Sequence, residues 1–531
     1  MRFVLVACFG LAGLSLLLPS EPSYDPWAWI VWGRELALLE LDTSGGPSWK
    51  PLPVAFTALF APFGKLSDGI PPALWLVLAR AGALLALVMA YRLARRLAGP
   101  ARATGIGAGL AAAAALALTP QWLRNMAHGN EVPLAIAFML WGIERHLDGA
   151  RGHAVGLGFL ACLLRPEVFP FLALYGLWLW RAEPGSRRLL AGLALALPAL
   201  WLVPEWIGSG HPFAAGEQAR TEPRWSLSLL EHPWLAALER AHGMAGLPLE
   251  LGALASVAVA WRRLRAAPGG ASATGEAAVG HGSARVVLAL AAVALSWVLL
   301  VAAMTQGGFS GSPRYFLPAV VIAGVLAGVG AAWLVAAAAR ALGRGSGAGR
   351  VLAGAGMTVA LGLAAAPWAA DRAERLERQA RDVGHLARLQ ADLAATVRSA
   401  GGPDAIVTRG MPAVNAAFHT RLAWEAKLAL ADIEDSRRRG LVFYTRAPLS
   451  GRKVVPSWPG RLRAVQGAGA WHVLVPVAGK MAARPCEEER PLDLRLAGAD
   501  RVTDQVHRHM HRCDRDKGDK RVARRHSPVR E

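Results

Sequence analysis

Long apolar runs with few charges, separated by short polar segments, occupy most of the first 370 residues of the chain. A helix of about 20 apolar residues crosses about 30 Å of hydrocarbon, and nine runs reach or approach that length. They lie at 3–19, 73–91, 105–119, 132–144, 189–204, 244–261, 286–304, 315–339 and 351–368. This pattern predicts an all-α polytopic membrane domain over residues 1–370.

A further apolar stretch, 154–180, is interrupted by Arg165-Pro166-Glu167 and is either one long broken helix or two short ones. If this stretch crosses the membrane twice, all the basic clusters of the chain fall on one side of the membrane, as expected for cytoplasmic loops. We therefore expect about eleven spans, a cytoplasmic N-terminus and an extracytoplasmic C-terminal domain. The clusters are Arg92, Arg95, Arg96, Arg102, Arg145, Arg151, Arg181, Arg187, Arg188, Arg262, Arg263, Arg265, Arg340, Arg344 and Arg350.

The segments that follow the first apolar run have a different character. The run itself could be a cleaved signal peptide, but no A-x-A-like site follows it and tryptophans flank it, which favours a retained helix. Pro26 to Leu41 has apolar residues at helical spacing, and Val54 to Phe63 is apolar but too short to span. We expect both to lie along the outer membrane surface, at about 26–64.

The polar tail predicts a second domain. Residues 371–400 have the pattern of an amphipathic helix, and short strand-like runs follow at 405–408, 441–445 and 472–476. This order indicates a small extracytoplasmic α/β domain over 371–483. Residues 484–531 are charged and poor in aromatic residues, which predicts disorder.

Composition supports this division. The chain has 531 residues, is 54% hydrophobic and carries a formal charge of +20. Because its arginines lie between apolar runs, membrane orientation explains them and no nucleic-acid partner is expected. Cys8 and Cys162 lie in apolar runs, and no Cys/His spacing typical of a metal site occurs. Cys486 and Cys513 in the tail are expected to form a disulfide outside the cell.

Charged groups inside or at the mouth of a span cost about 2.5–3.5 kcal/mol each when central, so each raises a functional question. Five of them lie near the predicted outer ends of apolar runs: Asp25, Glu131, Arg165, Glu167 and Arg314. Arg80, inside the second run, is a sixth.

At these residues the sequence resembles the GT-C superfamily of polytopic glycosyltransferases, similar to its protein-mannosyltransferase and aminoarabinose-transferase members. The matching stretches are YDPWAWIVWGREL, GGPSWKPLPV, TPQWLRNMAHGNEVPL, LLRPEVFPFL and SPRYFLPAV, in that order over residues 1–370, with VTRGMPAVNAAFHTRLAWE after the last span. The chain lacks the D-x-D and W-W-D-Y-G patterns of the oligosaccharyltransferase branch. That departure argues against a metal-dependent mechanism with a pyrophosphate donor.

The resemblance implies inverting transfer of a sugar from a polyprenyl-phosphate carrier to an envelope glycan, glycolipid or protein at the outer membrane face. Such chemistry needs a base for the attacking hydroxyl and cations for the leaving phosphate. Asp25 is the expected base and Glu131 the second catalytic acid. The expected phosphate ligands are Lys50, Arg165, Arg314 and Arg80, and the expected cavity residues are Trp27, Trp49, His128, Glu167 and Tyr315. No cofactor beyond the lipid donor is expected, although the sequence leaves a divalent metal open.

Each assignment has a structural alternative. Asp25 before Pro26 is a good helix cap, and Glu131 suits a helix start. Arg165 could pair with Glu167, Arg80 could pair with a buried carboxylate, and His128 could cap or snorkel. The tryptophans, including Trp29 and Trp32, are by default interfacial anchors.

Two other classes of function compete with the enzyme. A transporter or flippase of envelope precursors would also carry intramembrane charges and broken helices, but it predicts related halves, and no repeat is evident. A non-enzymatic envelope scaffold would use the tail as its working part. Replacing Asp25 would then leave its function intact.

Overall fold

The computed structural model describes residues 1–220, 226–266, 276–343, 347–433, 440–445, 447–449, 452–453 and 462–476. Most of this chain is helical. The helices are α1 (Arg2–Leu14), α2 (Tyr24–Leu38), α3 (Pro51–Phe60), α4 (Ile70–Ala98), α5 (Arg102–Ala117), α6 (Trp122–Ala127), α7 (Val132–Leu147), α8 (Arg151–Cys162), α9 (Phe169–Ala182), α10 (Arg187–Ser209), α11 (Ala214–Ala219), α12 (Pro233–Ala245), α13 (Leu247–Arg265), α14 (Glu276–Gln306), α15 (Pro313–Leu342), α16 (Gly347–Ser399), α17 (Gly402–Val407) and α18 (His419–Ala426).

Six strands and seven short 3₁₀ turns complete the described elements. The strands are β1 (Ala413–Val414), β2 (Val442–Thr445), β3 (Pro448–Leu449), β4 (Arg452–Lys453), β5 (Leu462–Ala468) and β6 (Trp471–Pro476). The turns are η1 (Ser15–Leu17), η2 (Ala61–Lys65), η3 (Pro166–Val168), η4 (Pro184–Ser186), η5 (Leu227–Leu229), η6 (Ala416–Phe418) and η7 (Leu430–Asp432).

The predicted apolar runs are helical over most of their length, except that the run 244–261 is bent by 90° at Gly246, between α12 and α13. The stretch 154–180 is broken at the predicted place. Arg165 has extended backbone angles, φ −141° and ψ 113°, and Pro166 opens a 3₁₀ turn between α8 and α9. Steric conflict between a proline ring and the preceding residue disfavours helix at that residue, which explains the break. The sequence thus located two helices joined by a charged turn.

Length and composition qualify five of the described helical segments as membrane spans: Ile70–Ala98, Pro184–Ser209, Gly280–Gln306, Pro313–Leu342 and Gly347–Ser399. α12 and α13 add a sixth if this pair, bent by 90°, counts as one. The chain is a multi-pass membrane protein on these grounds. The count of eleven spans remains a prediction.

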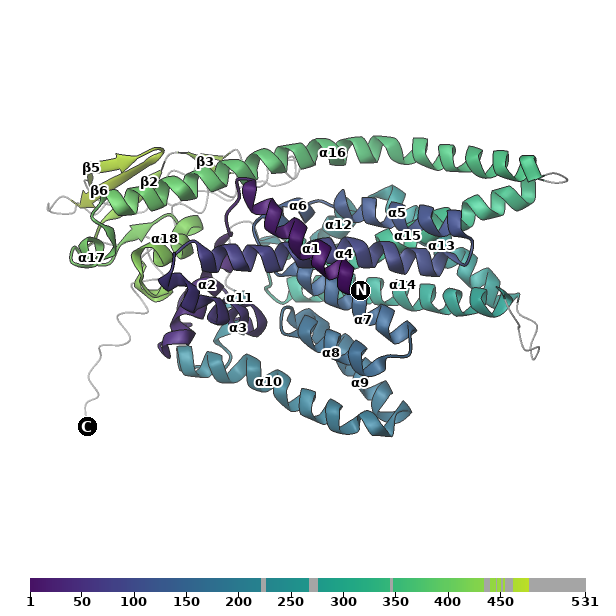
Figure 1. Cartoon of the computed structure of the whole chain (residues 1–531), viewed down its shortest axis with the longest axis horizontal. Coiled ribbons are helices and arrows are strands. Elements are labelled where there is room, and N and C mark those ends of the chain that lie inside the picture. The colour runs from purple at the N-terminus through teal and green to yellow at the C-terminus, as the bar shows by residue number, and fades with distance from the viewer. Residues whose placement is uncertain are drawn as a thin grey trace.

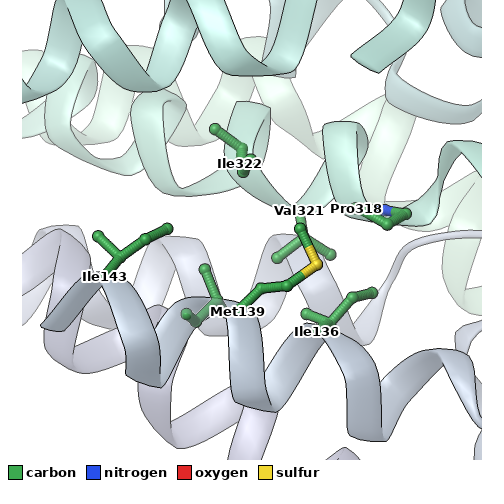
Figure 2. Close-up of a pocket in the computed structure, with 7 residues that line it drawn as sticks. Ile136, Met139, Ile143, Pro318, Val321 and Ile322 are labelled. Carbon is green, nitrogen blue, oxygen red and sulfur yellow. The ribbon is translucent and has the colours of Figure 1, made fainter. Parts of the chain in front are cut away.

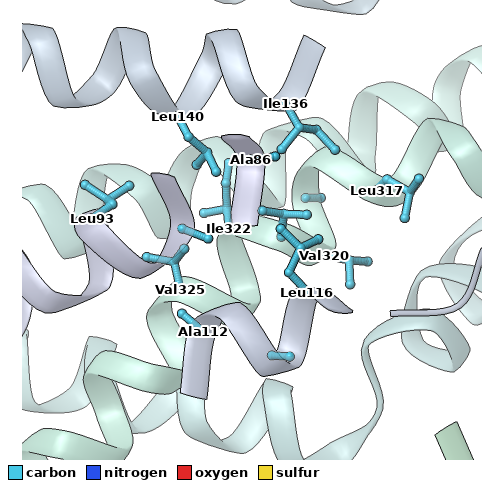
Figure 3. Close-up of a cluster of buried hydrophobic side chains, with 14 of the residues drawn as sticks. Ala86, Leu93, Ala112, Leu116, Ile136, Leu140, Leu317, Val320, Ile322 and Val325 are labelled. Carbon is cyan, nitrogen blue, oxygen red and sulfur yellow. The ribbon is translucent and has the colours of Figure 1, made fainter. Parts of the chain in front are cut away.

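α15 lies at the centre of the bundle and packs against α4, α5 and α13. Figure 3 shows the apolar side chains of this core, among them Leu93, Leu116, Leu140 and Val325. Glycines permit the close approach: an added Cβ at Gly330 would lie 2.0 Å from a carbonyl oxygen of α13. Small residues at helix interfaces are typical of membrane bundles.

α7 and α15 contact each other much less closely than α15 contacts α5 and α13. The cavity between them in Figure 2 is about 10 Å³ and is lined by Ile136, Met139, Leu140, Ile143, Pro318, Val321 and Ile322. This is about the volume needed for one water molecule and far less than a sugar needs. We therefore treat it as a packing defect in the core.

α16 connects the bundle to the second part of the molecule. It runs along one edge of the bundle and reaches the sheet at its far end, whereas α10 lies at the opposite edge (Figure 1). The predicted span 351–368 and the predicted amphipathic helix 371–400 are one continuous helix of 53 residues. The boundary expected at residue 370 therefore falls inside a helix.

The polar part contains a sheet with the strand order β1-β2-β6-β5. β1 and β2 are parallel, with Ala413 opposite Val442, while β6 is antiparallel to both β2 and β5. The runs 441–445 and 472–476 form β2 and β6, but the strand expected at 405–408 is wrong, because α17 covers 402–407. Pro403 in the first turn of α17 favours a helix start, and four apolar residues carry no reliable period.

The tryptophans of the first outer segment are core residues rather than interfacial anchors. Trp27, Trp29, Trp32 and Trp49 are at most 2% exposed. The expectation of a lipid-facing belt was wrong because α2 is covered by α3 on one side and by α18 of the polar part on another. Cys486, Cys513 and the expected disordered tail lie outside the described residues.

Candidate functional site

Five charged residues from five separate segments meet at one end of the bundle. Asp25 is in the first turn of α2, Arg314 is in the first turn of α15, and Lys50 and Glu131 immediately precede α3 and α7. Arg165 occupies the break after α8. A proline lies within two residues of each, and proline fixes φ at a helix start. The charged groups therefore project from rigid positions.

Arg314 and Asp25 form an ion pair between residues 289 positions apart. The distance from Arg314 Nη1 to Asp25 Oδ2 is 2.5 Å, and Asn130 Oδ1 lies 3.5 Å from the same nitrogen. Asn130 directly precedes Glu131, so this contact joins the pair to the rest of the cluster. The two side chains are partly open, at 27% exposed for Arg314 and 13% for Asp25.

Glu131 is the centre of a second, fully buried group. Its Oε1 accepts hydrogen bonds from Lys50 Nζ and, at 3.0 Å, from Arg165 Nη1. Arg165 Nη2 donates to Glu167 Oε1 at 2.6 Å. The Glu131 side chain is 0% exposed, and that of Arg165 is 3% exposed. The pairing of Arg165 with Glu167 that was kept open as an alternative is present.

The charges of this cluster balance. Lys50, Arg165 and Arg314 face Asp25, Glu131 and Glu167. Burial alone would raise the pKa of Glu131, but Lys50, Arg165 and Arg314 outweigh it and hold that pKa at about 2. Glu131 is therefore ionised at neutral pH, as a carboxylate surrounded by cations should be.

Several polar atoms of the cluster are buried without a hydrogen-bond partner among the described residues. They are Glu131 Oε2, Glu167 Oε2, Arg165 Nε and Arg314 Nε. Unsatisfied buried groups are uncommon in folded proteins and call for a reason, such as a ligand or ordered water. The two arginine Nε groups are donors suited to an anion.

Two aromatic rings border the cations. Tyr315 lies 4.7 Å below the Arg165 guanidinium and 5.9 Å from that of Arg314. The Lys50 ammonium lies 5.3 Å from the Trp29 ring, which meets Trp75 edge to face. Tyr315, which was expected to line the cavity, thus lies beside two of the expected phosphate ligands. Trp29 borders Lys50, and its position four residues after Asp25 puts both on one helix face.

The two tryptophans expected in the cavity point elsewhere. Trp27 Nε1 donates to Gln390 Oε1 at 2.7 Å, and its ring lies 4.2 Å from the Arg421 guanidinium. Trp49 Nε1 donates to Leu200 O at 3.3 Å. Both contacts join α2 and its neighbours to distant segments. These two rings therefore pack outside the charged cluster and support it from there.

Arg80 and His128 make hydrogen bonds that hold the segment before Asp25 in place. Arg80 donates to Ser15 Oγ at 2.9 Å, to Ser20 Oγ and to Ala127 O at 2.8 Å, and none of these groups belongs to the charged cluster. His128 Nδ1 lies 2.8 Å from Glu21 O, and burial lowers the pKa of His128 to about 4. The structure gives both side chains an anchoring position. The expected role of Arg80 as a phosphate ligand stays a prediction.

Sequence reasoning missed the residues of the polar part that hold the Asp25 segment. Gln390 of α16 accepts from Trp27 and donates from Nε2 to Pro22 O at 2.9 Å. Arg421 of α18 pairs with Glu21 at 3.3 Å. No local signal could have revealed these contacts, because their partners lie more than 360 positions away. Among the described residues, no group of three or more His, Cys, Asp or Glu side chains could hold a metal ion.

No family model and no curated protein matches the chain. Two solved structures are similar to it, both of ArnT from Cupriavidus metallidurans. The structure bound to undecaprenyl phosphate is 15% identical, with a TM-score of 0.46, over 91% of this chain and 99% of that one. The apo structure is 15% identical, with a TM-score of 0.45, over 89% of this chain and 97% of that one. At this degree of likeness, function has to be argued from the chain's own residues.

Proposed function

We propose that this protein is a membrane glycosyltransferase that moves a sugar from a polyprenyl-phosphate carrier to an envelope glycan, glycolipid or protein. The observation that carries the proposal is the Arg314–Asp25 pair beside the buried cluster of Lys50, Glu131, Arg165 and Glu167. It places a carboxylate next to several arginine and lysine donors at the end of a membrane bundle. A base and a phosphate-binding group are the two parts that such a transfer requires.

Charge balance indicates how the donor would bind. The cluster has no surplus positive charge, so an entering phosphate must take a cation from a carboxylate. Asp25 is the most exposed of the three carboxylates and Arg314 the most exposed of the three cations. We infer that the phosphate replaces Asp25 on Arg314, which binds phosphate well because its planar guanidinium can donate two hydrogen bonds.

This exchange would also activate the base. Asp25 released from Arg314 is free to accept the proton of the acceptor hydroxyl while the hydroxyl oxygen attacks the anomeric carbon. The carbon–oxygen bond to phosphate breaks, and the phosphate leaves with the bonding electrons, held by Arg314, Arg165 and Lys50. Attack from the face opposite the phosphate inverts the anomeric configuration. Glu131 keeps Lys50 and Arg165 in position throughout.

The proposal assigns no cofactor, because Arg314, once released from Asp25, supplies the positive charge that the leaving phosphate needs. Addition of EDTA is accordingly expected to leave transfer unchanged. A loss of transfer that Mg²⁺ or Mn²⁺ restores would show that a divalent metal takes part.

The proposal places the charged cluster and the polar part outside the membrane and the N-terminus in the cytoplasm, with about eleven spans. Arg96→Cys, Arg263→Cys and Ala405→Cys, each in a background without native cysteines, test this arrangement. A membrane-impermeant thiol reagent on intact cells should label only position 405. Labelling at 263 but not at 405 would contradict the topology.

Transfer by the purified protein is the direct test. The full chain in lipid nanodiscs is offered radiolabelled polyprenyl-phosphate sugars together with membrane extract as the source of acceptor. We expect label to move to a new product, and undecaprenyl phosphate to compete with the donor. Passage of the labelled lipid across a liposome membrane without transfer would instead support a flippase. If the protein shows neither sugar transfer nor lipid passage, the non-enzymatic envelope scaffold is the remaining class of function.

A further inference from the structure

A basic cavity lies at the other end of the bundle from the charged cluster. It has a volume of about 540 Å³ and lies between the C-terminal ends of α4 and α7 and the N-terminal end of α5. Glu131 and this cavity flank opposite ends of α7, which at 1.5 Å per residue is about 24 Å long. The cavity is therefore separate from the proposed active site, and only its position on the cytoplasmic side rests on the proposed topology.

Arginine is in excess in this cavity. Arg92, Arg95, Arg96 and Arg102 line it together with Glu144 and Asp148. Arg92 pairs with Glu144 at 2.6 Å and Arg96 with Asp148 at 2.5 Å. Arg95 and Arg102 are exposed and have no ion pair within the described ranges. Two cations thus remain available after both carboxylates are paired.

The surroundings add positive charge. Arg145 pairs with Asp148, so that carboxylate already serves two arginines. Trp333 Nε1 of α15 donates to Ala98 O at the edge of the cavity, and the Arg263 guanidinium lies 4.0 Å from the Trp333 ring. Membrane orientation explains why arginines gather on this side. It does not explain a hollow of this size lined with them.

We propose that this cavity binds a phosphoryl group at the cytoplasmic surface, with Arg95 and Arg102 as the free ligands and Arg92 and Arg96 held ready by their carboxylates. An anionic phospholipid headgroup and free inorganic phosphate share this chemistry. Basic pockets between helices on the cytoplasmic side of membrane proteins suit anionic lipid headgroups. Guanidinium groups bind phosphate oxygens in pairs, which favours arginine over lysine here.

The test compares the full chain with an Arg95→Gln/Arg102→Gln variant in nanodiscs of phosphatidylcholine with or without phosphatidylglycerol. Native mass spectrometry counts the phosphatidylglycerol that stays bound after extraction. Each lost contact near the surface weakens an anionic lipid severalfold, so we expect the double variant to bind about tenfold or more weakly. Arg188→Gln removes an exposed arginine of α10 outside the cavity and should bind like the parent.

The second arm uses inorganic phosphate. We expect inorganic phosphate at millimolar concentration to displace phosphatidylglycerol from the parent, and to bind the parent but not the double Gln variant. This result would show that the site recognises the phosphoryl group from either source. An Arg95→Lys/Arg102→Lys variant keeps both charges but loses the paired guanidinium contacts, so it should bind more weakly than the parent and more tightly than the double Gln variant. This intermediate binding would show that the Gln variant has lost a ligand and has not simply misfolded. Equal retention of phosphatidylglycerol by the parent and the double Gln variant, without phosphate binding to either, would overturn the proposal.

Discussion

The two ends of the bundle use the same residue types in opposite ways. In the charged cluster the ion pairs of Glu131 are buried, with Glu131 at 0% and Arg165 at 3% exposed. In the basic cavity the Arg96–Asp148 pair is open, at 40% and 34% exposed. An unpaired buried charge costs several kcal/mol, whereas an exposed one is solvated. The charged cluster must therefore balance its charges, while the basic cavity can keep surplus arginine.

That difference has a functional consequence. In the proposed mechanism, a ligand at the charged cluster exchanges partners with an existing ion pair, which couples binding to activation of Asp25. The proposed ligand of the basic cavity meets free arginines and needs no exchange. Binding at the basic cavity should accordingly weaken with salt, because exposed charges are screened over about 8–10 Å at physiological ionic strength.

The largest expected effect comes from Asp25→Asn, which removes the proposed base. Turnover should fall by about 10²–10⁴, the contribution of a well-placed general base. Donor binding should be unchanged or tighter, because Arg314 loses its competing carboxylate. Single-turnover transfer and donor binding are measured together. Asp371→Asn, at an exposed pair with Arg375 on α16, is the matched control and should have no effect.

The N-cap of α2 is Ser23, so Asp25 is not the helix cap that the sequence offered as an alternative. An Asp25→Asn protein that transfers sugar at the parental rate would reduce Asp25 to a structural partner of Arg314. The comparison between the two ends would then concern stability alone. Loss of both transfer and donor binding would also contradict the exchange model, since the model leaves Arg314 free to bind phosphate.

Removal of the buried partner is the next largest effect. Glu131→Gln leaves Lys50 and Arg165 without their shared carboxylate and should destabilise the fold by about 3–5 kcal/mol. Asp148→Asn in the basic cavity should cost about 1 kcal/mol or less. Thermal or denaturant unfolding in one detergent compares the two. Equal decreases in the free energy of unfolding for the two variants would show that burial does not distinguish the two ends of the bundle.

The same carboxylate sets a pH dependence. The folded pKa of Glu131 is about 2, below its ordinary value of 4.5. A lowered carboxyl pKa gives stability that is fully present above about pH 4.5 and is lost as pH falls towards about 2. Unfolding measured between these limits should show this loss in the parent and lack it in Glu131→Gln.

Substitution of the phosphate ligands should have an intermediate effect. Arg314→Gln loses a charge-assisted contact worth about 1.5–3 kcal/mol, so donor binding should weaken by about tenfold to a hundredfold and the rate should fall as well. Arg80→Gln is the comparison, since Arg80 contacts Ser15, Ser20 and Ala127 instead. If Arg80→Gln weakens donor binding more than it lowers thermal stability, Arg80 is a ligand after all.

The smallest effect is expected from Gln390, which holds Trp27 and Pro22 and so positions Asp25 from the polar part. Gln390→Met loses two neutral hydrogen bonds of about 0.5–1.5 kcal/mol each. We expect kcat to fall about tenfold with KM little changed, and Gln390→Glu, which keeps the acceptor for Trp27, to be intermediate. A fall in stability with unchanged kcat would make Gln390 purely structural.

The sequence by itself determined most of the helices and singled out the charges that meet in the cluster. Apolar runs of sufficient length form helices because each backbone hydrogen bond is made within the segment, and Pro166 broke the predicted stretch for a local steric reason. Charges near the predicted outer ends of the apolar runs pointed to Asp25, Glu131, Arg165, Glu167 and Arg314, and the resemblance to the GT-C superfamily added Lys50.

Only the tertiary structure decided which side chains face which partner. Trp29 borders the cations while Trp27 turns to Gln390, although both are tryptophans of one helix. Arg80 reaches serine and carbonyl oxygens rather than the cluster, and α16 continues through the expected boundary. Such choices depend on packing between segments hundreds of residues apart. Local periodicity contains no information on that packing, since it fixes the face of a helix but not the neighbour that the face meets.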